Sequence, residues 1–169
     1  RVYDWNGSLW SKVGDDIDGE AAYDYSGRSV SISSDGTRLA IGAYGNDGAG
    51  GAVNSTGHVR VYEEVGGVWT KVGGDIDGEA AGDMSGYSVS ISSDGTRVAI
   101  GAPYNDAEPS AGHPSGMSAA GHVRVFYDNS GTWEQVGTDI DGVAADDRTG
   151  SSVSLSSDGT RMAIGSPRQ

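Results

Sequence analysis

The chain of 169 residues contains no cysteine, only one phenylalanine and no long run of apolar residues. The lack of cysteine excludes disulfide bonds as a source of stability and leaves the redox compartment open. No run approaches the roughly 20 apolar residues of a membrane-spanning helix, and no helical apolar period lasts even three turns. Any core must therefore be built largely from valine, isoleucine, alanine, tryptophan and tyrosine.

Positive charge is also scarce, because 11 lysines and arginines face 24 aspartates and glutamates and give a net charge of −13. A strongly acidic surface is a poor partner for nucleic acids and for anionic membranes. We therefore expect no binding to nucleic acids, and the lack of a long apolar run predicts no membrane span. Cations or a salty environment suit this composition better.

Repetition is the most informative feature that is present. The segment SVSISSDGTR occurs at residues 29–38 and again at 88–97, and SVSLSSDGTR follows at 152–161. A tryptophan followed by a GxDIDG-type acidic segment precedes each copy, at Trp10, Trp69 and Trp133. A period of about 60 residues must be interpreted before any single motif, since residues shared by all copies serve to build the repeat.

The middle copy predicts four short antiparallel strands. Residues 88–92 alternate serine with apolar residues, an Asp-Gly turn follows, and residues 97–102 return as a strand rich in small residues. After a long polar loop, residues 122–126 and 132–137 form the third and fourth strands. Four-stranded units at this spacing predict an all-β fold of β-propeller blades; a β-solenoid is the alternative.

The register of the repeat divides the chain into two complete blades between two half blades. The third and fourth strands of a blade lie in 1–24, complete blades in 25–83 and 84–147, and the first and second strands of a blade in 148–169. About three blade-equivalents are fewer than the roughly four to eight of a closed propeller. We expect the open blade edges to pair with protein partners, in a six-bladed homodimer or in a longer parent chain.

Three motifs in the order SGYSV, AIGAP and GHVRVF resemble the FG-GAP repeat, the blade unit of the integrin α-subunit propeller. The resemblance implies a β-propeller, usually seven-bladed, that lies outside the cell or at its surface and serves adhesion or ligand binding without catalysis. Many members carry a calcium loop between the first two strands. This chain has only SSDGT there, so the family's metal site cannot be carried over.

The acidic linkers between the copies are the first candidate site. Alternating carboxylates with a glycine resemble the start of a calcium loop, and the aspartates concerned are Asp16, Asp18, Asp24, Asp75, Asp77, Asp83, Asp139, Asp141 and Asp147. The first two linkers add Glu20 and Glu79, whereas the third has Val143, so a site that uses this glutamate is lost there. The alternative is that aspartate and glycine shape the turns between blades, and we expect no strong calcium dependence.

The long loops between the second and third strands are the second candidate site, because variable loops on a rigid scaffold often bind ligands. The polar residues in these loops are Asn46, Asp47, Asn105, Asp106 and His113. Trp5 is the one tryptophan outside the repeat and is a further candidate for a surface contact. Asn6 and Asn54 begin N-glycosylation triplets, which matter if the protein is eukaryotic and secreted.

The remaining histidines, His58 and His122, occupy equivalent positions in the repeat, which favours a role in the strands over catalysis. The sequence thus predicts a non-enzymatic extracellular propeller segment without a cofactor, used for adhesion or surface assembly through protein–protein contacts. A carbohydrate-binding propeller is the first alternative. A glycosidase or lyase is the second, although it needs a non-repeating carboxylate cluster that the sequence does not show.

Overall fold

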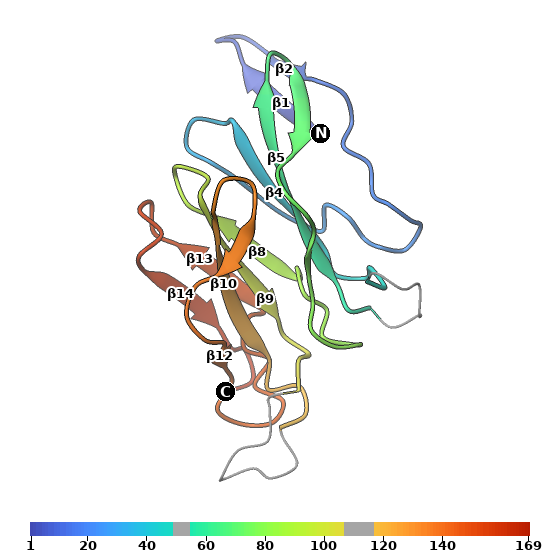
Figure 1. Ribbon diagram of the computed structural model, residues 1–169, viewed down its shortest axis with the longest axis vertical. Helices are drawn as coiled ribbons and strands as arrows, with labels where there is room; N and C mark the ends of the chain where they lie inside the picture. Colours follow the sequence, from blue (N-terminus) through green and yellow to red (C-terminus); the bar gives the residue numbers. More distant parts are fainter. Residues whose placement is uncertain (49–54, 107–116) are drawn as a thin grey trace.

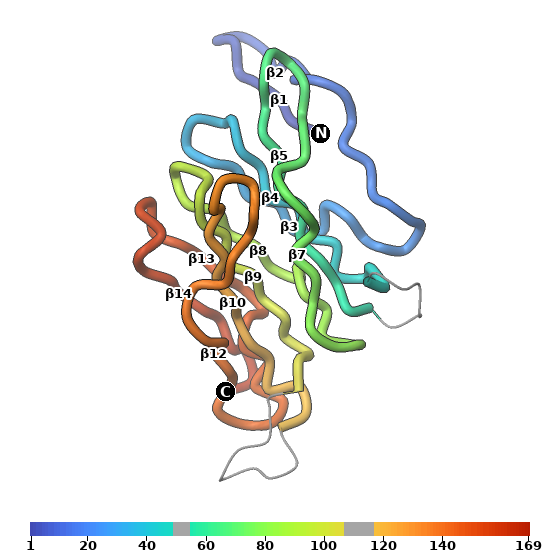
Figure 2. Tube along the Cα trace, viewed as in Figure 1, coloured from blue at the N-terminus to red at the C-terminus, as the bar shows by residue number. Residues whose placement is uncertain are grey.

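The computed structural model describes residues 1–48, 55–106 and 117–169, and its regular structure in these ranges consists of β-strands. Four sheets follow one another along the chain (Figures 1 and 2). Within the described ranges, no helix has the length and apolar character that a membrane crossing requires.

In the described part of the chain, the pairings between named strands are antiparallel, and one isolated bridge, Gly57 to Ser85, is parallel. The first sheet contains β1 (Val2–Trp5) and β2 (Trp10–Val13). The second contains β3 (Ser29–Ile32), β4 (Arg38–Ala43), β5 (His58–Val65), β6 (Val68–Lys71) and β7 (Ile76–Asp77). The third contains β8 (Ser88–Ile91), β9 (Arg97–Ala102), β10 (His122–Asp128), β11 (Trp133–Gln135) and β12 (Ile140–Asp141). The fourth contains β13 (Ser152–Leu155) and β14 (Met162–Gly165).

The two larger sheets have the four-stranded order expected of a blade, β3-β4-β5-β6 and β8-β9-β10-β11. Each also has a short fifth strand that the sequence analysis did not predict. Part of the acidic linker, β7 or β12, pairs with the start of the third strand, so that Ile76 lies opposite Val59 and Ile140 opposite Val123. These strands have two residues each, too short for an alternating pattern to show.

The core lies between the sheets rather than within any one of them. On β4, Leu39 and Ile41 belong to an apolar cluster that also contacts Val2 of the first sheet. Ala40 belongs instead to the cluster shared with Val89 and other residues of the third sheet. Because both faces of a blade are covered, β4 and β9 are nearly continuous apolar runs, as in other strands buried on both sides.

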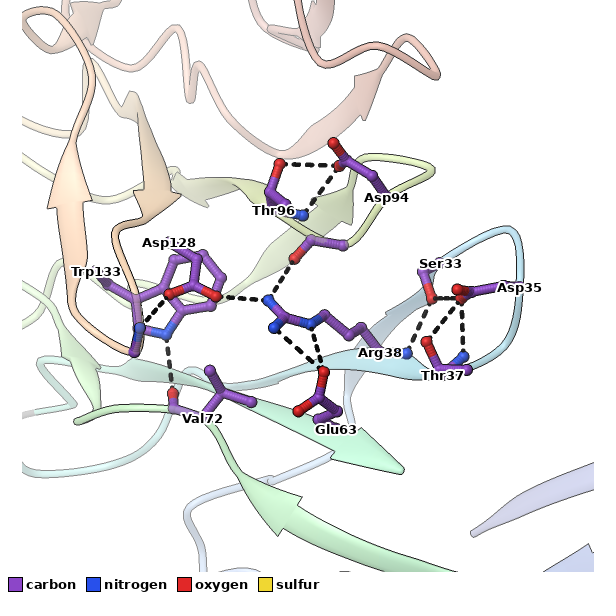
Figure 3. Close-up of polar contacts among 12 residues, drawn as sticks. Ser33, Asp35, Thr37, Arg38, Glu63, Val72, Asp94, Thr96, Asp128 and Trp133 are labelled. Carbon is purple, nitrogen blue, oxygen red and sulfur yellow. Dashed lines mark hydrogen bonds and ion pairs between the residues drawn. The ribbon is translucent and has the colours of Figure 1, made fainter. Parts of the chain in front are cut away.

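Repeated tryptophans join the outer strands of consecutive sheets. The indole N–H of Trp69 donates to the carbonyl of Val13 at 3.1 Å, and that of Trp133 donates to the carbonyl of Val72 at 2.9 Å (Figure 3). Both side chains also pack against the apolar clusters between the sheets. The recurrence of tryptophan is therefore explained by contacts between blades.

Arginines that follow the Asp-Gly turns form a second link between blades. Arg38 lies between Glu63 of its own blade, at 3.3 Å, and Asp128 of the next blade, at 2.6 Å (Figure 3). The equivalent Arg97 also contacts the next blade, because its Nη1 donates to the carbonyl of Asp158. Asp128 is largely buried, which shields this ion pair from the solvent that weakens exposed pairs.

Glycine allows the inner strands of consecutive blades to approach closely. A Cβ on Gly101 of β9 would meet the carbonyl oxygen of Gly150, just before the next blade's first strand. We expect Gly101→Ala to lower the free energy of unfolding by about 1–3 kcal/mol, because the backbones must separate. Urea unfolding measures the change.

The matched control is Gly74→Ala. Gly74 has no neighbour within 4 Å of an added Cβ and no left-handed backbone angle, so its stability should stay within about 0.5 kcal/mol of the parent chain. Equal effects of the two substitutions would contradict close packing between the blades.

The Asp-Gly turns predict an acid dependence of stability. Hydrogen bonds from Ser156 and from Thr160 lower the pKa of Asp158 from 3.8 to about 2, and bonds from Ser33 and Thr37 do the same for Asp35. A depressed folded pKa means that this stabilisation is present above pH 4 and is lost as the pH falls from about 4 to about 2. Melting temperatures across this range should decline less for Asp158→Asn than for the parent chain; parallel curves would contradict the assignment.

Candidate functional site

Each complete blade brings together one histidine, one glutamate and one aspartate. The first cluster contains Glu20, His58 and Asp75, and the second contains Glu79, His122 and Asp139. Within each cluster, the carboxylate and imidazole atoms lie within 4.8 Å of one another. The clusters occupy equivalent positions of the repeat, so the fold builds the same arrangement twice.

Three parts of the chain supply each cluster. The histidine begins the third strand of the blade, the glutamate comes from the linker before the blade, and the aspartate comes from the linker after it. The unexpected short strands make this possible: His58 pairs with Asp77 on β7, and His122 pairs with Asp141 on β12. This pairing carries Asp75 and Asp139 across the start of the third strand.

Both imidazoles are buried, and that of His58 is not fully hydrogen-bonded. Both histidine side chains are 2% exposed, and Nε2 of His58 has no hydrogen-bond partner. Nδ1 of His58 lies 3.9 Å from Oε2 of Glu20, and Nδ1 of His122 lies 3.7 Å from Oε2 of Glu79, longer than a hydrogen bond. Burial lowers the pKa of both histidines, against the opposing effect of the nearby carboxylates, which favours neutral rings.

An arginine orients the glutamate of each cluster. Nη1 of Arg60 lies 3.6 Å from Oε1 of Glu20, and Nη1 of Arg124 lies 3.4 Å from Oε1 of Glu79. Nη2 of each arginine donates to a carbonyl of the linker, that of Asp18 or Asp77. The glutamate therefore has one oxygen toward the arginine and the other toward the histidine.

The two clusters differ in the partner of the aspartate. Asp75 accepts a hydrogen bond from the ammonium of Lys71 at 2.8 Å, whereas Asp139 accepts one from the uncharged amide of Gln135 at 2.6 Å. The first cluster thus has one positive charge more than the second.

The second cluster adjoins a polar pocket of about 550 Å³. Glu79 and Asp139 line it, together with Asp83, Asn105 and Asp106. All five residues are candidates from the sequence, and the structure places them around one cavity. Tyr104 adds an aromatic ring to the same wall.

Several predicted metal ligands hold the linkers in shape. Asp24, Asp83 and Asp147 are buried and accept hydrogen bonds from backbone N–H groups three or four residues earlier in their own linkers. Asn46 and Asn105 donate to Asp24 and Asp83, at 3.1 and 3.0 Å, and so tie each long loop to the preceding linker.

The other predicted aspartates form ion pairs, are exposed or bind the backbone of a loop. Asp16 forms ion pairs with Arg1 and Lys12. Asp18, Asp77 and Asp141 are exposed to solvent. Asp47 and Asp106 accept backbone hydrogen bonds across the bases of their long loops.

The remaining candidates are at the start of the chain or outside the described residues. Trp5 is exposed and lies against Trp10, with 5.6 Å between the ring centroids. The side chain of Asn6 accepts hydrogen bonds from the backbone of its own turn. Asn54 and His113 lie outside the described residues.

The association of the histidines with Glu20 and Glu79 was not predicted from the sequence. One signal was available: both the histidine and the glutamate recur in the first two copies, and the third linker has Val143 instead of glutamate. Recurrence alone does not bring the residues together, because the glutamate and the aspartate belong to different linkers.

Antiparallel four-stranded sheets that pack face to face in series define a β-propeller repeat protein. The family model described as the FG-GAP repeat matches residues 17–62 and 76–119, more than half of the chain. The chain therefore belongs to the FG-GAP repeat family, which confirms the resemblance inferred from its motifs. No curated protein sequence matches it significantly.

The hydrogen bonds of the buried aspartates lead to a prediction for Asp83. Asp83→Ala should lower the free energy of unfolding by about 1–3 kcal/mol, because Asn105 and the N–H of Ala80 lose their acceptor. Asp77→Ala removes an exposed carboxylate of the same linker and should change stability by less than about 0.5 kcal/mol. Equal losses in urea unfolding would contradict this role of Asp83.

Proposed function

We propose that the chain is a non-enzymatic structural and adhesive propeller segment that acts outside the cell through contacts between blades. The observation that carries this proposal is a difference between equivalent residues. Val89 and Ile91 of β8 are 8% and 7% exposed, whereas Val30 and Ile32 of β3 are 59% and 47% exposed. In the third sheet these apolar positions are buried against the preceding blade, whereas the same positions of β3 are exposed to solvent.

The exposed face borders an apolar groove of about 540 Å³. Val30 and Ile32 form one side, and Val2, Tyr3 and Trp10 of the first sheet form another. The first sheet corresponds to the outer strands of a blade, so the groove lies where the inner strands of that blade would pack. An inner hairpin of the same repeat would occupy this place in a complete blade.

The fourth sheet is such a hairpin. In a complete blade the second strand pairs on both sides, as β4 does with β3 and β5, but β14 pairs only with β13 among the described residues. The face of the third sheet next to this hairpin is also partly uncovered. Ile140 of β12 is 44% exposed, whereas the equivalent Ile76 of β7 is 4% exposed. The two half blades lie at opposite ends of the row of sheets (Figure 1), so each needs a partner from another blade.

A second copy of the chain can supply both of these strand pairs, as further blades of a longer parent chain would. Pairing β14 of one copy with β1 of another completes a four-stranded sheet and covers Val30 and Ile32 at the same time. Unpaired edges of this kind favour association with another strand. Two copies of net charge −13 repel each other, so added salt should strengthen the association by screening the charges.

Carbohydrate binding is the second candidate function, and the polar pocket beside Glu79 favours it. Asn105, Asp106 and Tyr104 offer hydrogen-bonding groups and an aromatic ring in one cavity, which suits a sugar. However, Asn105 is buried and donates a hydrogen bond to Asp83, and Asp106 accepts one from the backbone N–H of Ala119. Much of the polarity of this pocket is thus already used within the protein.

The proposed assembly predicts a concentration-dependent mass in solution. Light scattering should show twice the mass of one chain at high concentration, with Ile32→Lys shifting the equilibrium toward the monomer because it places a charge on the covered face. Val65→Lys is the matched control, since Val65 is also exposed but lies at the β5–β6 hairpin. A monomer at every concentration and salt level, or equal behaviour of the two variants, would contradict the proposal.

A further inference from the structure

We propose that the two Glu–His–Asp clusters are binding sites for a divalent transition-metal ion such as Zn²⁺, and that the second cluster binds it more tightly than the first. This inference does not depend on the proposed assembly, because each cluster is formed within one chain.

The donor atoms select the kind of metal. An imidazole nitrogen with two carboxylate oxygens suits zinc and neighbouring transition metals, whereas calcium takes oxygen ligands. Ligands of a tetrahedral zinc ion lie roughly 3.4 Å apart, given metal–ligand distances of about 2.1 Å. Nδ1 of His122 already lies 3.7 Å from Glu79 and 3.9 Å from Asp139. Small side-chain movements are enough to close this geometry.

The buried histidines are the independent observation that indicates a ligand. A buried polar side chain normally has a hydrogen-bond partner. Both histidine side chains are 2% exposed, and their Nδ1 atoms lie 3.9 Å from Glu20 and 3.7 Å from Glu79, beyond hydrogen-bond distance. Nε2 of His58, which also lacks a partner, is on the other side of the ring and would not bind this metal. A metal ion between Nδ1 and the carboxylates would satisfy the ring nitrogen that faces the cluster.

The arginines leave the metal ligands available. Arg60 and Arg124 approach Oε1 of Glu20 and Glu79, and the opposite oxygen, Oε2, faces the histidine. The glutamate side chains are 44% and 43% exposed, so an ion can enter from solvent. At the second cluster, Glu79 and Asp139 also form part of the wall of the polar pocket.

Charge distinguishes the two clusters. The groups that act on the first histidine are Glu20, Asp75, Asp77 and Arg60, and Lys71 is bound to Asp75. Those that act on the second are Glu79, Asp83, Asp139 and Arg124, with the neutral Gln135 on Asp139. The extra ammonium at the first cluster repels a divalent cation, which predicts roughly tenfold weaker binding there.

The test is calorimetric titration of the full chain with Zn²⁺ after removal of metals with a chelator, in buffer containing enough salt to screen non-specific binding. We expect two ions per chain with unequal affinities. Gln135→Lys gives the second cluster the positive charge that it lacks, and Lys71→Gln removes that charge from the first cluster. Gln135→Lys should weaken the tighter site about tenfold, and Lys71→Gln should strengthen the weaker site by a similar factor.

Paired variants separate the site from general acidity. Asp139→Asn should abolish one equivalent of binding, whereas Asp141→Asn, which removes an exposed charge from the same linker, should leave both. Ca²⁺ should bind more weakly than Zn²⁺. Non-saturable binding, equal losses in Asp139→Asn and Asp141→Asn, or no effect of either charge exchange would overturn the proposal. Should Asp139→Asn unfold, the exposed Gln135→Lys still decides the question.

Discussion

Contact between the faces of adjacent blades is the constraint on which the rest of this structure depends. Each blade is apolar on both sides, so Ala40 and Leu39, neighbours on one strand, enter different clusters and contact different sheets. A single blade cannot bury both of these faces within itself, which is typical of repeat proteins. Burial of the apolar side chains therefore depends on contact between sheets, and Val30 and Ile32 of β3 remain exposed where the equivalent Val89 and Ile91 are buried.

The polar links follow from the same close approach. Gly101 lets the backbones come together, Trp133 donates across the outer strands, and Arg38 spans from Glu63 to Asp128. The glycine, the tryptophan and the arginine recur with the repeat, and each of these three joins one blade to the next. The acidic linkers have a double role, because they turn the chain between blades and also cross the start of the third strand. That crossing is what assembles the Glu–His–Asp clusters.

Much of the fold was predictable because the same strand and turn pattern occurs three times in the sequence. The alternation in SVSIS and the turn at Asp94-Gly95 predicted β8 and β9 with nearly their observed bounds, and the motif order predicted the family. The pairing of Ile76 with Val59 was not predictable, since a two-residue strand has no period. For the same reason the clusters were missed: Glu79 and Asp139 lie in different linkers, and only the tertiary pairing brings both to His122.

The central claim is that open faces of this repeat are completed by another blade. Hydrogen exchange, followed strand by strand as protein concentration rises, tests it most directly. The account predicts that amides of β14, at Met162–Gly165, gain protection with concentration, while those of β9, which pairs on both sides, are protected throughout. Exchange in β14 that does not change with concentration, or that matches β9 in the dilute chain, would contradict it.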